Sequence, residues 1–224
     1  MKKIVIEHLS KKFGKQEVLK DINLTMQTGK IYGIAGYNGS GKTVMFKCIC
    51  GLIIPDSGII RIDDKKVKKG EILTDVGMII EGPAYLKRKS AYDNLCLLYQ
   101  IRNRVDKEYL YKVLRQVGLD PVSKKPAGKF SLGMKQRLGI AQAVMEDPPF
   151  LILDDPLNGL DKNGIKEMRD FFLEMKNSGK IILMASHNKY DMEILCDELY
   201  ELEAGKLVYE KNDELSLETP DIKW

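Results

Sequence analysis

The residues best suited to chemistry lie in one short segment, residues 36–43, which reads Gly-Tyr-Asn-Gly-Ser-Gly-Lys-Thr. Its glycines let the backbone turn tightly with N–H groups pointing inward, and a helix that begins there presents its positive end to the same point. A lysine ammonium and a threonine hydroxyl complete the set. The segment matches the P-loop pattern G-x-x-x-x-G-K-[ST] in full, which indicates a site for a nucleotide's phosphates.

Residues of this segment are expected to bind two partners, the nucleotide and a metal ion. We predict that Lys42 contacts the β- and γ-phosphates of ATP and that the Thr43 hydroxyl ligates Mg²⁺. The predicted nucleotide contacts here are Gly36, Tyr37, Asn38, Gly39, Ser40, Gly41, Lys42 and Thr43. A glycine-rich turn that binds nothing is the alternative, but a β-rich apolar run precedes the segment and a helical pattern follows it.

Two adjacent carboxylates follow the apolar run at 150–153. A P-loop site needs an acid at the end of a buried strand to hold the metal through water, and Asp154 fits that role. Asp155 is then placed to polarise an attacking water. Without the P-loop, the same pair could simply cap the next turn.

Six short β-rich runs alternate with helical patterns and must position these groups. The apolar runs lie at 4–7, 31–35, 59–62, 76–80, 150–153 and 181–185. Runs of this kind are typical of strands buried on both faces. Apolar residues at helical spacing recur at 110–117, 134–145 and 165–175. The alternation predicts an α/β fold with a mainly parallel sheet.

Two departures from the alternation divide the chain. Residues 1–35 and 56–80 are strand-rich with turn signals, which favours an antiparallel β flank. Residues 87–145 read as helices only, which indicates a helical subdomain inserted into the core. We therefore expect a single nucleotide-binding domain with its core at about 1–86 and 146–210 and a polar tail at 211–224.

Composition limits the other possibilities. The chain has 224 residues and a net charge of +4, too mild to predict nucleic acid as a partner. Its longest apolar runs are far shorter than the roughly 20 residues that span a bilayer. The first residues reach Glu7 too soon for a signal peptide, so we expect a cytoplasmic location. The four cysteines form no C-x-x-C pair and favour free thiols.

Residues 130–137, Phe-Ser-Leu-Gly-Met-Lys-Gln-Arg, resemble the signature motif of ATP-binding cassette (ABC) ATPases. With the P-loop, residues 154–161 and His187, the resemblance covers almost the whole chain in the family's order. It implies that Phe13 stacks on adenine with Val18 nearby, and that His187 bonds the γ-phosphate. The remaining nucleotide contacts that it implies are Ser131, Leu132, Gly133, Met134 and Asp161.

The same resemblance implies partners. In the family, the signature segment contacts ATP bound to a second subunit, so a homo- or heterodimer is expected. Ser131 at a helix start can donate a hydroxyl and backbone N–H groups to that anion, or serve only as a helix cap. An integral-membrane permease would hold the dimer at the cytoplasmic face. Residues 85–93, with Tyr85 and Leu86, would meet that permease.

Three residues depart from the family's usual pattern. Glu81 stands where Gln is common, Asp155 where the catalytic Glu is common, and Met134 departs within the signature. We expect Glu81 to act in catalysis, as a metal ligand and as the link to the permease contact. Asp155 is one methylene shorter than Glu, and misplacement by about 1 Å can cost about 10²-fold in rate.

The segments at 80–86 and 131–137 resemble the branch that serves bacitracin-type and lantibiotic export or self-protection. The sequence therefore predicts a transport ATPase of the antibiotic or peptide type. A hydrolysis-poor regulatory subunit of a heteromeric complex is the alternative, favoured by Asp155. Two basic clusters, at 65–69 and 87–89, are expected to be solvated faces.

Overall fold

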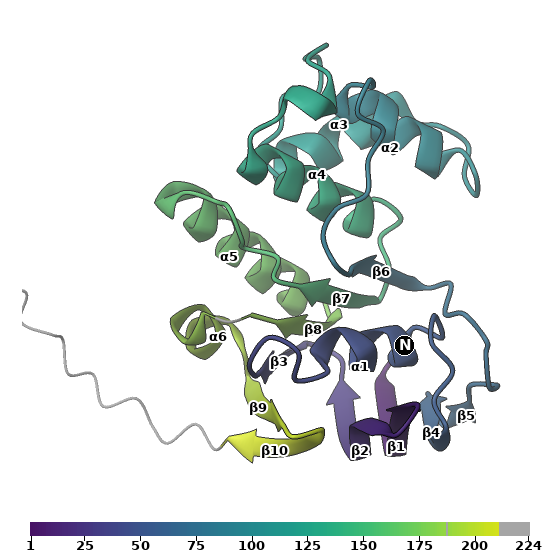
Figure 1. Cartoon of the computed structure of the whole chain (residues 1–224). Helices are drawn as coiled ribbons and strands as arrows, with labels where there is room; N and C mark the ends of the chain where they lie inside the picture. The colour runs from purple at the N-terminus through teal and green to yellow at the C-terminus, as the bar shows by residue number, and fades with distance from the viewer. Residues whose placement is uncertain (187, 211–224) are drawn as a thin grey trace, which may run out of the picture.

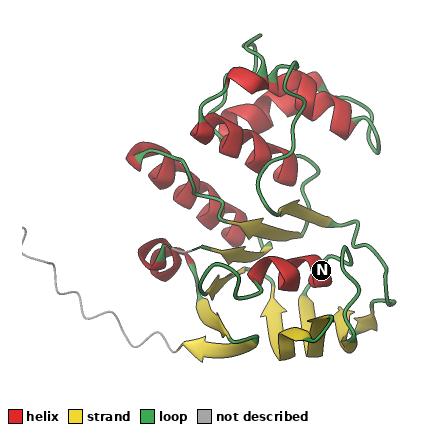
Figure 2. Cartoon of the chain, viewed as in Figure 1, coloured by secondary structure: helices red, strands yellow, loops and turns green. Residues whose placement is uncertain are grey.

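Two β-sheets and six α-helices make up the computed structural model, which describes residues 1–186 and 188–210 (Figures 1 and 2). The strands are β1 (Lys3–Phe13), β2 (Gln16–Gln27), β3 (Lys30–Ala35), β4 (Ser57–Ile62), β5 (Lys65–Lys66), β6 (Val76–Ile79), β7 (Phe150–Asp154), β8 (Ile181–Ala185), β9 (Glu198–Glu203) and β10 (Lys206–Glu210). The helices are α1 (Lys42–Ile49), α2 (Ala91–Tyr99), α3 (Lys107–Gln116), α4 (Leu132–Val144), α5 (Lys162–Asn177) and α6 (Lys189–Leu195), with a 3₁₀ turn η1 (Ala127–Lys129).

The larger sheet carries the chemistry-bearing loops. Its six strands run in the order β10-β9-β3-β8-β7-β6, parallel from β9 to β6, with β10 antiparallel at one edge. The carboxyl ends of β3 and β7 therefore point to the same edge of the sheet. The P-loop follows β3 and the acidic pair follows β7, so parallel pairing brings these two distant segments together.

Both faces of the larger sheet are buried, as the uninterrupted apolar runs predict. On β7, Phe150 and Ile152 pack into the core that contains α1, whereas Leu151 and Leu153 pack into the core that contains α4 and α5. Successive side chains of a strand point to opposite faces, so a strand covered on both sides needs apolar residues at every position. Because β7 is held on both faces, Asp154 has a fixed position at the carboxyl end of the strand.

The smaller sheet is antiparallel, with the order β2-β1-β4-β5. It packs through Ile4, Ile6 and Leu24 against α1, which lies between the two sheets. The antiparallel flank expected over residues 1–35 and 56–80 was therefore too broad, because β3 and β6 belong to the parallel part of the larger sheet. A short apolar run has the same appearance in either sheet, and pairing partners are not visible in it.

Helices α2, α3 and α4 form a separate group at the top of Figure 1, away from the smaller sheet. Ser90 begins α2 with a capping box, in which its hydroxyl accepts from the Asp93 backbone N–H and the Asp93 carboxylate bonds back to Ser90. Leu110, Val113 and Leu114 give α3 its buried face. Helix α4 packs against α2, α3 and β6, so it connects the helical group to the sheet.

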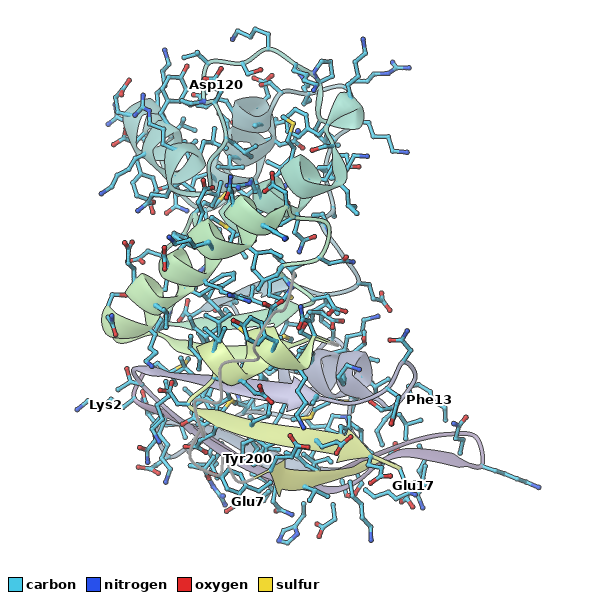
Figure 3. All side chains as sticks on the ribbon, turned by 90° about the vertical axis from the view of Figure 1, so that its left-hand side faces the viewer. Lys2, Glu7, Phe13, Glu17, Asp120 and Tyr200 are labelled. Carbon is cyan, nitrogen blue, oxygen red and sulfur yellow. The ribbon has the colours of Figure 1, made fainter. Side chains whose placement is uncertain are left out.

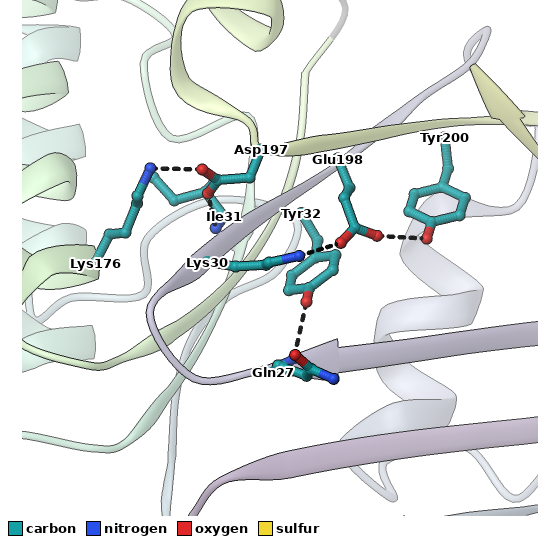
Figure 4. A network of polar contacts seen from close by, with 8 residues as sticks. All are labelled: Gln27, Lys30, Ile31, Tyr32, Lys176, Asp197, Glu198 and Tyr200. Atoms are coloured by element: carbon teal, nitrogen blue, oxygen red, sulfur yellow. Dashed lines mark hydrogen bonds and ion pairs between the residues drawn. The ribbon is translucent and has the colours of Figure 1, made fainter. Parts of the chain in front are cut away.

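A polar network fastens β9 to the strand that leads into the P-loop (Figure 4). Asp197 accepts from the Ile31 backbone N–H at 2.8 Å and pairs with Lys176 of α5 at 2.6 Å. Glu198 pairs with Lys30 at 2.7 Å and accepts from the Tyr200 hydroxyl at 2.9 Å. Burial and the Glu198 carboxylate raise the pKa of Tyr200, so its hydroxyl remains protonated and able to donate.

Within residues 1–186 and 188–210, no helix combines the length and the apolar character that crossing a membrane requires. Cys48, Cys50 and Cys196 are buried free thiols, and Cys96 is a partly buried one. Burial raises the pKa of Cys50 to about 12, which keeps it protonated and unreactive at neutral pH.

Candidate functional site

The glycine-rich loop connects β3 to α1 in a conformation that glycine alone supports easily. Gly36, Gly39 and Gly41 have φ values of 145°, 81° and 110°. A Cβ on Gly36 would lie 2.7 Å from the Leu202 carbonyl and 2.8 Å from the Ser40 hydroxyl, so a side chain does not fit there. The spacing of the glycines is therefore a steric requirement of this turn.

Two polar side chains are buried inside the loop. Lys42 is only 9% exposed, and its Nζ donates to the carbonyls of Gly36 at 2.7 Å and Tyr37 at 3.1 Å. The Ser40 Oγ is buried and has no hydrogen-bond partner among the described residues. Buried polar atoms are normally paired, so the unpaired hydroxyl beside a cationic amine fits a loop that binds an anionic ligand.

Thr43 and Asp154 meet across the gap between α1 and β7. The Thr43 hydroxyl donates to Asp154 Oδ2 at 2.9 Å, and the Glu81 backbone N–H also donates to this carboxylate. Burial raises the pKa of Asp154 despite the Thr43 hydrogen bond, and the nearby Asp155 charge adds to the rise. Hydroxyl and carboxylate oxygens are the donors that Mg²⁺ prefers, so the pair fits that ion.

Asp155 lies next to this pair with its backbone in the left-handed region, at a φ of 47°. Its N–H donates to the Ala185 carbonyl at 2.9 Å, and its carbonyl accepts from Asn158 N–H at 3.2 Å and from Gln136 Nε2 at 3.1 Å. Aspartate enters this backbone region more readily than most residues with a Cβ. The backbone thus gives a physical reason for the short acid.

A cavity of about 330 Å³ opens beside these groups. The sequence-predicted residues that line it are Phe13, Val18, Asn38, Gly39, Gly41, Lys42, Thr43, Asp154 and Asp155. Phe13 is 48% exposed at the end of β1, and the Lys11 ammonium lies 5.3 Å from its ring centroid. Val44 also lines the cavity and was not predicted, although its place directly after Thr43 in the first turn of α1 indicates it.

Glu81 is joined to this site in a different way. Its carboxylate pairs with Lys47 of α1 at 2.8 Å, and its backbone has a positive φ of 61°. Lys47 was not predicted, yet it lies four residues after Thr43 on the same helix and therefore one turn further along. Glu81 thus contacts α1 through its side chain and Asp154 through its backbone.

The signature residues lie outside the cavity lining. Ser131 is the N-cap of α4, and its hydroxyl accepts from the Met134 backbone N–H at 3.2 Å. A Cβ on Gly133 would approach the Gly159 carbonyl to 2.9 Å, so the start of α4 lies against the loop before Asp161. Asp161 is the N-cap of α5 and accepts from Gly164 N–H at 2.8 Å. His187 lies outside the described residues.

The fold and these contacts define a P-loop cassette whose helical subdomain carries a second, outward-facing motif. The family model described as ABC transporter matches residues 19–158, which is more than half of the chain. The chain belongs to the ABC transporter family, as an ATP-binding subunit of the ABC ATPase type. The predicted fold class and family are thereby confirmed.

Known relatives lie in the branch that the sequence resembles. The bacitracin transport ATP-binding protein BcrA of Enterococcus faecalis is 40% identical, over 93% of this chain and 69% of its own. The lantibiotic transport ATP-binding protein SrtF of Streptococcus pyogenes is 38% identical, over 92% of this chain and 89% of its own.

Solved structures show the same fold. An ATP-binding subunit of an ABC transporter matches with a TM-score of 0.81 and 28% identity, covering 94% of this chain and 90% of its own. A cassette described as a dimer in a post-hydrolysis state with ADP and Pi matches with a TM-score of 0.82 and 22% identity, over 93% of this chain and 98% of its own.

Proposed function

We propose that this chain hydrolyses ATP as one half of a cassette dimer and thereby drives a separate membrane permease that exports an antibiotic or peptide. The observation that carries the proposal is the Thr43–Asp154 contact at 2.9 Å beside the buried Lys42. It joins the P-loop to the acid of β7 in the arrangement that phosphoryl transfer needs. The relatives named for bacitracin and lantibiotic transport support the class of cargo.

In this proposal the core residues bind and orient the substrate. The loop of residues 36–43 and the Lys42 ammonium hold the phosphates, and Phe13 with Val18 contacts the adenine. Thr43, Asp154 and Glu81 hold Mg²⁺, which supplies charge neutralisation at the phosphates. The Glu81 side chain must leave Lys47 or coordinate through water to serve there, since the two now form an ion pair.

Asp155 acts on water in the proposed reaction. Its position next to Asp154 and at the rim of the cavity suits a carboxylate that orients a nucleophile and accepts its proton. By the family's motif, His187 bonds the γ-phosphate. The fixed backbone of Asp155 limits where its short side chain reaches, so slow turnover is part of the proposal.

The signature segment supplies the reason for a dimer. Residues 131–134 and Asp161 contribute nothing to the lining of the chain's own cavity, yet Ser131 begins α4 at the surface. We propose that they contact the nucleotide of a second cassette, identical or not. We also propose the division of the chain into a core at about 1–86 and 146–210 and a helical subdomain at 87–145.

A second cavity offers a place for the permease. It has a volume of about 650 Å³ and lies between β6, α1, α2 and α4, with Met78, Pro83, Leu98 and Glu146 in its lining. Glu81 directly precedes the Gly82–Ala84 stretch of this lining, and its backbone N–H contacts Asp154, so a segment docked there is one residue away from a direct contact with the proposed metal site. The permease would then hold the cassette at the cytoplasmic face of a membrane.

The alternative, a hydrolysis-poor regulatory subunit paired with a more competent one, is favoured by one observation, the positive φ of Asp155. At that backbone position glutamate would carry more strain than aspartate. The backbone therefore favours the shorter acid, which reaches less far toward an attacking water. Both proposed functions require nucleotide binding, and they differ in the rate of ATP turnover.

The experiment that tests the proposal is Mg-ATP hydrolysis by the purified chain over a range of protein concentrations, with Lys42→Ala as the blank. Turnover that rises faster than linearly with concentration supports a self-sufficient homodimer. ATP binding without turnover, reversed by a partner cassette, supports the regulatory alternative. A chain that binds no Mg-ATP while Lys42 is intact contradicts both.

A further inference from the structure

Two basic segments that are distant in sequence lie side by side in the helical subdomain. The Ala127 N–H donates to the Lys89 carbonyl and the Gly128 N–H donates to the Lys87 carbonyl, each at 2.8 Å. These bonds hold the loop before α2 against the turn η1. The sequence showed only the first of these segments as a cluster, because the second, at 124–129, is interrupted by proline, alanine and glycine.

Together the segments form a surface that we call the basic platform. Its cations are Lys87, Arg88, Lys89, Lys124, Lys125 and Lys129, all exposed. Among the described residues none of them forms an ion pair with an acid. The longer stretches that contain these segments, residues 85–93 and 120–131, hold two acids, Asp93 and Asp120. The platform thus concentrates cations in a chain whose net charge is only +4.

Asp93 is committed to the start of α2 and forms no ion pair with these cations among the described residues, so its charge offsets only one of the six. Its carboxylate accepts from the Ser90 hydroxyl at 2.8 Å within the capping box. That hydrogen bond lowers the pKa of Asp93, and the charges of Lys89 and Lys124 lower it further.

Apolar side chains accompany the charges. Leu86 precedes the first basic segment and is 54% exposed, and Val122 precedes the second and is 60% exposed. Figure 3 places Asp120, four residues before the second segment, at the end of the molecule opposite Glu7 and Tyr200. Aliphatic side chains beside a group of lysines are the composition of surfaces that rest on anionic bilayers.

We infer that the basic platform binds the anionic phospholipid headgroups of a membrane surface, with Val122 entering the headgroup boundary. The choice of a membrane rests on the proposed function, which holds the cassette beside one. Nucleic acid fits the platform less well, because single strands are bound by stacking on exposed aromatic rings. Tyr85 and Tyr92 are partly buried, and the exposed apolar side chains beside these cations are aliphatic. The contact needs neither ATP nor the permease.

Vesicle sedimentation of the purified full chain tests the inference. The vesicles are pure phosphatidylcholine or its mixture with phosphatidylglycerol, at low and at raised salt. The test variant carries Lys124→Gln, Lys125→Gln and Lys129→Gln together. Its matched control carries Lys65→Gln, Lys66→Gln and Lys69→Gln, which removes equal charge from an exposed hairpin of the smaller sheet.

We expect binding to the mixed vesicles only, weakened by salt, and about 30-fold weaker binding in the test variant, because each lysine near an anionic surface contributes to the attraction. The control should lose less than about threefold, as charges a Debye length or more from the bilayer are screened. Val122→Ser, at an exposed position where folding is not at risk, should weaken vesicle binding about threefold and leave binding of a DNA oligonucleotide unchanged.

Three results would overturn the inference: equal losses in the test and control variants, equal binding to pure phosphatidylcholine, or tighter binding to the DNA oligonucleotide than to the mixed vesicles. ATP hydrolysis measured on the same samples keeps the two proposals separate. A chain that sediments as expected but hydrolyses nothing retains the platform and loses the proposed ATPase role. If the chain and both variants hydrolyse ATP but none of them sediments with vesicles, the platform is excluded and the proposed ATPase role is retained.

Discussion

The two motifs that contact nucleotide in the proposed dimer have opposite surroundings in one chain. The P-loop side is enclosed, with Lys42 only 9% exposed and a cavity of about 330 Å³ beside it. The signature side is an open helix start, where Leu132 is 60% exposed and the Ser131 hydroxyl accepts from its own helix. An enclosed site can bind a nucleotide within one chain, whereas an open one needs a second chain to present the nucleotide to it.

The two sides are nevertheless connected through α4. Gln136, which is buried, donates from Nε2 to the Asp155 carbonyl at 3.1 Å. One residue later, Arg137 donates to the Val117 carbonyl and to Glu167 of α5, both at 2.7 Å. A shift of α4 therefore reaches Asp155, the proposed catalytic acid, and α5 directly. Variants on the P-loop side should change nucleotide binding by a single chain, whereas variants on the signature side should change only the steps that need two chains.

Lys42→Ala should have the largest effect, because it removes the buried cation that we propose holds the phosphates. We expect hydrolysis to fall by about 10³-fold and nucleotide affinity to fall with it. Equilibrium binding of a fluorescent ATP analogue and phosphate release measure the two effects. Lys66→Ala, at an exposed edge strand, is the control and should change neither. Full affinity in the Lys42 variant would show that the enclosed side is not the binding site.

Asp155→Asn should separate binding from chemistry on the enclosed side. Asparagine keeps the size and tolerates the left-handed backbone at φ 47°, but it cannot accept a proton from water. We expect turnover to fall about 10²-fold while nucleotide affinity is retained. Stopped-flow phosphate release together with binding titrations would measure this. Unchanged turnover would remove Asp155 from the reaction and favour another group as the base.

Asp155→Glu is the complementary change at the same position. The longer side chain gains reach, but the positive φ costs glutamate about 1 kcal/mol more backbone strain than a residue suited to that region. We expect no gain in turnover and a lower melting temperature, read by circular dichroism. A clear gain in turnover would show that the length of the acid alone limits the rate.

The arrangement of the enclosed side follows from local sequence signals, whereas the open side was predicted only from its resemblance to a family motif. The glycines at 36, 39 and 41 and the acid after the apolar run each follow from local backbone chemistry, and parallel pairing of the strands brings them together. The limits of the antiparallel sheet were predicted too broadly, because a short apolar run does not reveal its pairing partner.

What sequence reasoning missed are contacts between distant segments. Gln136 was noted only as part of a motif, and nothing in its local pattern indicates the carbonyl of Asp155, which is 19 residues further along. The Lys47–Glu81 ion pair and the basic platform also arise from tertiary packing. Caps and turns can be predicted because they depend on residues that are neighbours in sequence. The contacts named here depend on how the helices pack against the sheet, which the local sequence does not reveal.

Ser131→Ala should affect only events that need two chains. Loss of the N-cap costs α4 about 1 kcal/mol, which a folded domain tolerates. In the proposed dimer it also removes a hydrogen bond to a charged phosphate, so kcat should fall roughly 30-fold. Affinity of the single chain for nucleotide should be unchanged, because Ser131 does not line the cavity.

Ser123→Ala is the matched control for Ser131→Ala, since it removes a partly buried serine hydroxyl from the same subdomain, outside both motifs. Steady-state hydrolysis at several protein concentrations distinguishes the two. If Ser131→Ala lowers single-chain nucleotide affinity as much as turnover, the separation into an enclosed and an open side is wrong.

Gln136→Met should give the smallest effect and the sharpest test of the connection through α4. Methionine matches the length of glutamine in a buried position but donates no hydrogen bond, and the Asp155 carbonyl still accepts from the Asn158 N–H at 3.2 Å. Loosening Asp155 by one hydrogen bond should lower kcat about fivefold and leave KM unchanged. Gln142→Met on the same helix is the control, because its Nε2 has no hydrogen-bond partner among the described residues. Equal effects of the two changes would mean that α4 responds only through packing, whereas a loss confined to Gln136 would show that the open side holds the acid of the enclosed side in place.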